Sequence, residues 1–226
     1  MSDGIRNRLQ AATVAFAPLF LLAALAYHPY IRDLTDKAEV AGAMSVGVTR
    51  WGLAHVAVGV GFGLLLLALL AVRSLLREAG EQRWSAPAVP FLVMGTIFAT
   101  FLPAMETGMI PAFQAGVDAV ALQTNLSPWF VPMMVAGALV FGTGVILLAA
   151  GIVASGVFER QQARIIAGAL AVVAISRFVP QGRALYAGAV AGVIALAPVA
   201  VRMWAAVPGY SRRRPAPTAG SYRPAR

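Results

Sequence analysis

The sequence contains no cysteine, only two histidines and a single lysine, Lys37. The absence of cysteine excludes disulfides, thiolate nucleophiles, cysteine-ligated zinc, iron–sulfur clusters and thiol redox chemistry. A retinal Schiff base is excluded because Lys37 lies in a predicted loop. Intramembrane serine proteolysis is excluded because both histidines precede residue 56. No zinc protease motif, P-loop or dinucleotide fingerprint occurs.

Charged side chains are also scarce. They make up 12% of the 226 residues, and 59% of the residues are hydrophobic. Soluble domains carry about 25% charged residues. The composition therefore predicts an integral membrane protein.

Six stretches lack charged side chains and approach the roughly 20 residues that a helix needs to cross the hydrocarbon of a bilayer. We expect spans at residues 10–29, 52–72, 87–105, 130–155, 165–180 and 184–202. The fifth is the weakest, because its 16 residues fall short of the hydrocarbon thickness. The predicted fold class is an all-α, polytopic bundle of six transmembrane helices over residues 1–206. Residues 207–226 are expected to form a disordered, basic cytoplasmic tail.

The basic residues indicate the orientation of these spans. With the N-terminus in the cytoplasm, thirteen of the eighteen basic residues and four of the nine acidic ones fall on the cytoplasmic side. That side then carries the entire net charge of +9. We therefore expect both termini in the cytoplasm of a bacterium, in its inner membrane. The positive charge needs no nucleic-acid partner.

Two segments outside the membrane are long enough to hold structure. Residues 30–51 are expected to form a short surface helix or coil. In residues 106–129, apolar side chains recur at helical spacing, which suggests an interfacial helix that roofs the bundle. An ordinary connecting loop with one buried face is an equal alternative.

Small residues indicate which helix faces pack, because lipid provides no hydrophobic drive for association. The pattern predicts inward-facing stripes at three places: Gly59 and Gly63; Gly137, Gly144 and Gly151; and Gly188 and Gly192. The same faces are candidates for a homo- or hetero-oligomer.

The few ionisable residues near the predicted spans gather on the non-cytoplasmic side. His28 ends the first span and His55 opens the second, while Glu106 ends the third and Arg177 lies near the outer end of the fifth. Because ionisable groups within a membrane are costly, they are candidates for function. The alternatives are that His28 sits in an interfacial aromatic belt and that Glu106 and Arg177 form an ion pair closing the bundle.

Two metal hypotheses use the same region. His28 and His55, on adjacent helices at similar depth, are a candidate pair of haem ligands. Methionines near Glu106 and the fourth span suggest a Cu(I) site, although methionine also fills gaps in apolar bundles. These methionines are Met44, Met105, Met109, Met133 and Met134. The main hypothesis includes neither a metal nor a cofactor.

The order of several motifs resembles a family of uncharacterised six-helix bacterial membrane proteins, a domain of unknown function. The second predicted helix opens with Arg50-Trp51-Gly52-Leu53, and its leucine-rich run ends in Arg73 and Arg77. A glycine-rich fourth helix then leads through Gly156-Val157-Phe158 into a basic turn. The resemblance implies the architecture and no activity.

The leading functional hypothesis is non-redox acid–base chemistry, of an isomerase or cyclase type, on a lipophilic substrate such as an isoprenoid. Glu106 would be the acid, His55 its proton partner, Arg177 an orienting charge and His28 a further catalytic candidate. The predicted apolar wall consists of Trp51, Phe98, Phe101 and Trp129. The alternative is a non-catalytic accessory or scaffold subunit, or a small-molecule permeation protein. The expected partners are the bilayer and this lipophilic substrate.

Overall fold

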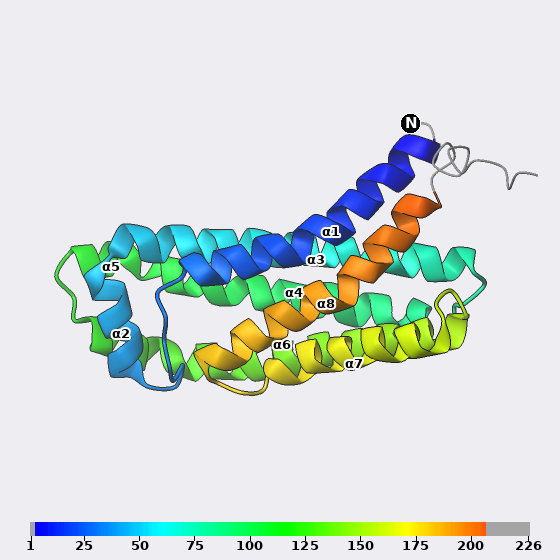
Figure 1. Ribbon diagram of the computed structural model, residues 1–226. Coiled ribbons are helices and arrows are strands. Elements are labelled where there is room, and N and C mark those ends of the chain that lie inside the picture. Colours follow the sequence, from blue (N-terminus) through cyan, green and yellow to red (C-terminus); the bar gives the residue numbers. More distant parts are fainter. Residues whose placement is uncertain (1–2, 207–226) are drawn as a thin grey trace, which may run out of the picture.

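The computed structural model describes residues 3–206, and these residues form eight α-helices (Figure 1). The predicted tail at residues 207–226 lies outside the described part of the chain. The helices are α1 (Asp3–Tyr27), α2 (Lys37–Val46), α3 (Val48–Glu78), α4 (Ser85–Gly108), α5 (Ile110–Gln114), α6 (Ala119–Ser155), α7 (Arg160–Ser176) and α8 (Gly182–Ala205).

Six of these helices pack side by side as a closed ring, in the order α1, α3, α4, α6, α7, α8 and back to α1. Neighbours in the ring run in opposite directions, including α1 and α8, which close it (Figure 1). Each of the six ring helices contributes fully buried side chains to one central core. Examples from the six helices in chain order are Val14, Leu69, Leu92, Leu148, Leu170 and Leu196.

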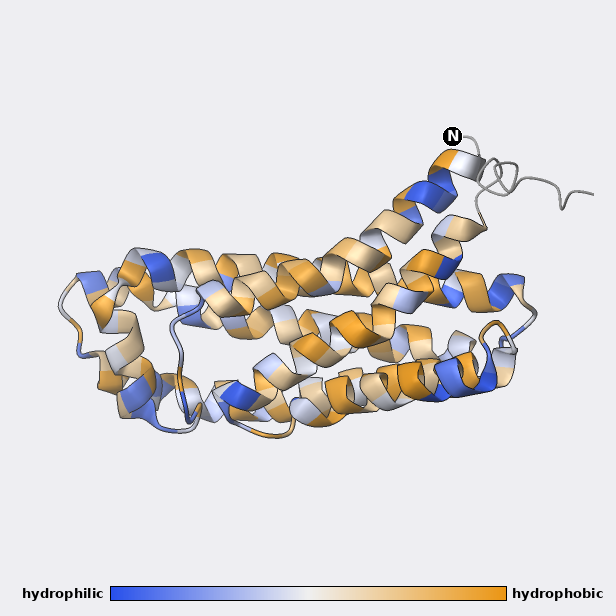
Figure 2. Cartoon of the chain, viewed as in Figure 1, coloured by the Kyte–Doolittle hydropathy of each residue, from blue (hydrophilic) through white to orange (hydrophobic). Residues whose placement is uncertain are grey.

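Within residues 3–206, five helical segments are long and apolar enough to cross a membrane. They are Gly4–Tyr27, Val48–Glu78, Ser85–Gln114, Ala119–Ser155 and Gly182–Ala205. The sixth helix of the ring, α7, has 17 residues and is therefore only about 26 Å long. Hydrophilic residues gather toward the two ends of the bundle, and its sides are mostly apolar (Figure 2). The all-helical, multi-span prediction is confirmed at this level.

The segment between the third and fourth predicted spans differs from both expectations. It holds only the five-residue helix α5 before α6 begins at Ala119. Asp118 caps α6 by accepting a hydrogen bond from the backbone N–H of Ala121 at 2.8 Å. The helix then continues for 37 residues, through Pro128 and Pro132. Residues 119–129 therefore prolong the bundle instead of roofing it, and α6 ends where Gly156 adopts a φ of 68°.

A small cap, residues 28–47, covers one end of the ring (Figure 1). It contains the surface helix α2, which agrees with the short surface helix expected within residues 30–51. Asp36 caps the start of α2, and α2 packs against α6 and α3. The carboxylate of Glu39 accepts hydrogen bonds from the backbone N–H groups of Arg32, at 2.5 Å, and Asp33, at 3.1 Å. These bonds fix the path of the chain between α1 and α2.

The predicted glycine stripe of α6 forms a close contact with neighbouring elements. A Cβ added at Gly137 would lie 2.9 Å from the Cβ of Phe98, and one at Gly144 would lie 2.8 Å from the backbone nitrogen of Leu92. At Gly151 it would meet the carboxylate of Glu81 at 2.8 Å. These distances are too short for a side chain, so glycine is what allows α6 and α4 to approach this closely.

The other two stripes behave differently from each other. Gly188 packs against the side chain of Ser176, and Gly192 lies near Pro18, so the stripe on α8 faces its neighbours as predicted. On α3, a Cβ at Gly63 would have no neighbour within 4 Å. The close-packed glycine of α3 is Gly61, against Leu21 of α1. The prediction for Gly63 is therefore wrong, whereas Gly59 faces Pro103 of α4 as predicted.

Candidate functional site

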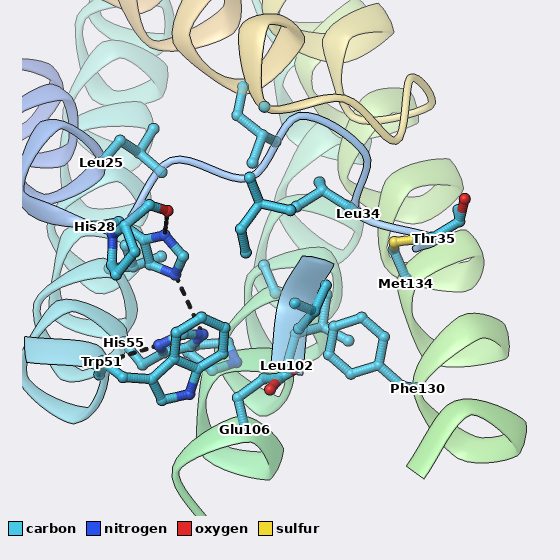
Figure 3. A pocket seen from close by; sticks show the side chains of 18 of the residues that line it. Leu25, His28, Leu34, Thr35, Trp51, His55, Leu102, Glu106, Phe130 and Met134 are labelled. Atoms are coloured by element: carbon cyan, nitrogen blue, oxygen red, sulfur yellow. Dashed lines mark hydrogen bonds between the residues drawn. The ribbon is translucent and has the colours of Figure 1, made fainter. Parts of the chain in front are cut away.

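A cavity of about 270 Å³ lies between the cap and the ring. Its walls come from the cap, from the first turns of α3 and α8, from the last turns of α4 and from α6, with Arg177 just after α7. Most of the lining is apolar, and a small group of polar side chains projects into it (Figure 3). Such a combination is typical of binding sites for small molecules.

Two histidines face each other at the edge of this cavity (Figure 3). His28 follows the last residue of α1, and His55 lies in the second turn of α3. Their Nε2 atoms are 3.4 Å apart. The Nδ1 of His28 lies 2.6 Å from the carbonyl oxygen of Pro29, and the Nδ1 of His55 lies 2.8 Å from that of Trp51. Burial lowers the pKa of His28 from its ordinary value.

Trp51 holds the two imidazole rings in place. Its ring centroid lies 5.2 Å from that of His28 and 4.4 Å from that of His55. The indole is 1% exposed, and its Nε1–H has no hydrogen-bond acceptor within residues 3–206. Buried donors are normally paired, so this N–H is an unsatisfied polar group next to the histidines.

Glu106 is buried at the end of α4 and also lines the cavity. Its Oε2 accepts a hydrogen bond of 2.9 Å from the side-chain amide of Gln123 on α6. Both side chains are less than 10% exposed, at 6% and 7%. The amide orients the carboxyl group and leaves its other oxygen without a protein partner in the described residues.

Arg177 lies where the outer cavity meets a smaller, apolar cavity in the core of the ring. The centre of its guanidinium group is 4.5 Å from the centroid of the Phe62 ring, which is a cation–π distance. In residues 3–206 the structure has no ion pair between Arg177 and Glu106. The predicted ion pair is therefore wrong, because Gln123 takes the carboxylate and the guanidinium stacks on Phe62.

Five of the eight predicted site residues line the same cavity: His28, Trp51, His55, Glu106 and Arg177. The pairing differs from the one expected, since the Nε2 of His55 faces His28 and not Glu106.

Phe98, Phe101 and Trp129 do not line the cavity. The cavity-facing stripe of α4 passes through Ala99, Leu102 and Glu106, so the two phenylalanines lie beside it. Trp129 is 72% exposed on the outside of α6. The inner positions on that helix belong to Phe130 and Met134 instead (Figure 3).

The sequence interpretation missed Gln123 and Tyr186. Gln123 lies in the segment for which the sequence predicts a roof or a connecting loop. Because α6 extends through that segment, Gln123, Ser127, Phe130 and Met134 recur at helical spacing on one face. Tyr186 lies near the start of α8 and donates a hydrogen bond of 2.8 Å to the carbonyl oxygen of Leu25. Nothing in the sequence signals that long-range bond.

The haem hypothesis does not fit the histidine pair. Axial ligands stand on opposite faces of a flat macrocycle, which places their nitrogens about 4 Å apart when each metal–nitrogen bond is about 2.0 Å. The separation of 3.4 Å and the ring-centroid distance of 4.7 Å leave no room for a porphyrin. Of the candidate copper ligands, Met134 lines the cavity, whereas Met44 is buried in the core of the cap. In residues 3–206, no group of three or more His, Asp or Glu side chains could hold a metal ion.

By its fold, the chain is an all-helical bundle of the multi-pass membrane type. At one end it has a mostly apolar cavity into which a few polar side chains project. In comparisons with family models, with curated proteins and with solved structures, nothing matches this chain. The resemblance to a six-helix family stays a prediction, and the function has to be inferred from the cavity itself.

Proposed function

We propose that the protein crosses a bacterial cytoplasmic membrane six times, with both termini in the cytoplasm. Five segments have the required length and apolar character. The case for α7 rests on its place in the ring, where it runs from one end of the bundle toward the other between α6 and α8. Phe178, Val179 and Pro180 extend its apolar character beyond Ser176, and local thinning of the bilayer accommodates the remaining shortfall at a small cost.

Cysteine labelling tests this topology without background, because the natural chain has no cysteine. Ser45→Cys and Arg183→Cys should react with a membrane-impermeant maleimide on intact cells. Gln161→Cys should react only after the membrane is permeabilised. If Arg183→Cys reacts only after permeabilisation, α7 does not cross the membrane.

We further propose that the cavity binds a lipophilic substrate, such as an isoprenoid, and carries out non-redox acid–base chemistry on it. The observation that carries this proposal is Glu106, a buried carboxyl group on the wall of an otherwise apolar cavity. The hydrogen bond from Gln123 occupies one oxygen, so the other can carry the transferable proton.

The neighbouring groups provide binding and orientation. Arg177, which has no carboxylate partner in the described residues, attracts an electron-rich head group. In an isomerisation, Glu106 would give its proton to one carbon of a double bond, and the resulting Glu106 carboxylate would take a proton from an adjacent carbon, which restores a double bond and the carboxyl group. Because His55 faces His28, we do not assign it as the proton partner of Glu106.

The experiment starts from protein extracted together with its native lipids. Molecules that co-purify with the wild-type chain, and that are depleted in Arg177→Met, are identified by mass spectrometry and returned to the protein in D₂O. An acid–base enzyme should introduce solvent deuterium into the product. Glu106→Gln should retain binding and lose deuterium incorporation.

Glu78→Gln is the matched control, because it makes the same chemical change at an exposed position on the last residue of α3. It should behave like the wild type. If the wild-type protein binds a lipid but introduces no deuterium, the non-catalytic alternative, an accessory or permeation protein, becomes the better explanation.

A further inference from the structure

The proposed acid–base chemistry gives no function to the histidine pair, although the pair is rigidly held on the cavity wall. Each Nδ1 lies at hydrogen-bonding distance from a backbone carbonyl oxygen. A carbonyl oxygen can only accept, so each Nδ1 must carry the hydrogen. In the neutral rings, both Nε2 atoms then present lone pairs, and these lone pairs face each other across 3.4 Å.

Two acceptors in that arrangement repel each other unless a positive charge lies between them. Metal-binding histidines show the same arrangement: one ring nitrogen binds the ion while the other donates to a backbone carbonyl or carboxylate, which fixes the tautomer and the ring orientation. Here both rings have this second contact, and Trp51 packs against both of them.

The distance between the nitrogens also selects a coordination geometry. Zinc–imidazole bonds are about 2.0–2.1 Å long. Two such bonds to nitrogens 3.4 Å apart enclose an angle of about 110° at the ion. This is close to the tetrahedral angle, which zinc prefers in proteins.

We propose that His28 and His55 together bind a zinc-class divalent ion through their Nε2 atoms, in tetrahedral geometry. Because no third His, Asp or Glu side chain in residues 3–206 completes a group with them, the other positions would be taken by water or by a molecule in the cavity. Such an open site could polarise a bound head group as a Lewis acid. The proposal does not depend on the acid–base function of Glu106.

The test uses the full-length protein in detergent, treated with a chelator and then titrated with Co²⁺ or Zn²⁺. The expected result is one ion per chain and, with Co²⁺, the intense visible absorption of a tetrahedral complex. His28→Gln and His55→Gln should each lose this absorption and at least tenfold in affinity. Glu106→Gln, which alters a side chain of the same cavity, should keep both.

A second measurement covers the case in which a histidine variant does not fold. Bound Co²⁺ should quench the fluorescence of Trp51, whose ring lies 4.4 Å from that of His55, and Zn²⁺ added in excess should reverse the quenching. The quenched component should be missing in Trp51→Phe. Absence of stoichiometric uptake, a weak octahedral spectrum, or uptake that is unchanged in folded histidine variants would overturn the proposal. In those cases the pair shares a proton, or the ions bind elsewhere.

Discussion

The close approach of α4 and α6 predicts a large effect for one added methyl group, in Gly95→Ala. A Cβ at Gly95 would lie 2.5 Å from the Cα of Phe141 and 2.6 Å from its Cβ. Carbon atoms pack best at about 3.5–4.0 Å, so the two helices would have to separate by about 1 Å. The obstacle includes backbone, which cannot rotate away as the end of a side chain can.

The magnitude follows from two opposing effects. Overpacking in a tight core costs about 1–3 kcal/mol, and the upper end applies because backbone must move. Alanine is favoured over glycine within a helix by about 1 kcal/mol. The expected net change is a loss of about 2 kcal/mol in the free energy of unfolding, with the steric cost exceeding the helix-propensity gain.

Gly63→Ala is the matched control. It makes the same change within α3, where the added Cβ has no neighbour within 4 Å. We expect this variant to be neutral or more stable by up to about 1 kcal/mol. Reversible unfolding in mixed micelles, at increasing fractions of SDS, measures both variants by circular dichroism. Equal stabilities of the two variants would refute the reasoning, because the sign of the effect is set by the contact with Phe141.

Three further predictions use the same unfolding assay or amide hydrogen exchange. Glu39→Ala should speed hydrogen exchange at the backbone amides of Arg32 and Asp33, which donate hydrogen bonds to the Glu39 carboxylate. Hydrogen bonds to a charged group are each worth about 1.5–3 kcal/mol. Unchanged exchange would mean that other contacts hold the cap. Tyr186→Phe should destabilise the fold by about 1 kcal/mol through loss of its bond between α8 and α1, and an effect below the error of the assay would contradict this. Leu148→Ala, in the fully buried core, should lower the free energy of unfolding by about 2–5 kcal/mol, whereas Leu139→Ala, at a side chain that is 54% exposed, should lower it much less. Similar losses in the two variants would show that Leu148 does not lie in the core.

The sequence predicts the helices well because the thickness of the hydrocarbon restricts where charges can lie. The third predicted span, 87–105, and the sixth, 184–202, each fall within three residues of α4 and α8 at both ends. The same rule fails for residues 119–129, which extend beyond the expected span. Pro128 and Pro132 both lie inside this continuous helix.

The site could be predicted only in part, for a different physical reason. The positions of charged and imidazole side chains along the chain indicate their depth, so the gathering of His28, His55, Glu106 and Arg177 at one end follows from the topology. Which of them touch is decided by the rotation of each helix about its axis. A hydropathy pattern does not define that rotation closely enough, so the partnership of Glu106 with Gln123 could not be foreseen.

The contact between α1 and α8 has a consequence for the order of biosynthesis. Of the helices in residues 3–206, α1 is the first and α8 the last to be synthesised, and they close the ring by lying side by side. The segments that follow α1 and α7 are joined by backbone hydrogen bonds, from Leu34 to Pro180 and from Gly182 to Arg32. The loop that carries His28 therefore gains its final support only after the start of α8 has been synthesised. A nascent chain lacking α8 would leave the first helix with an open flank toward lipid, so assembly of the cavity must be a late, post-insertion event.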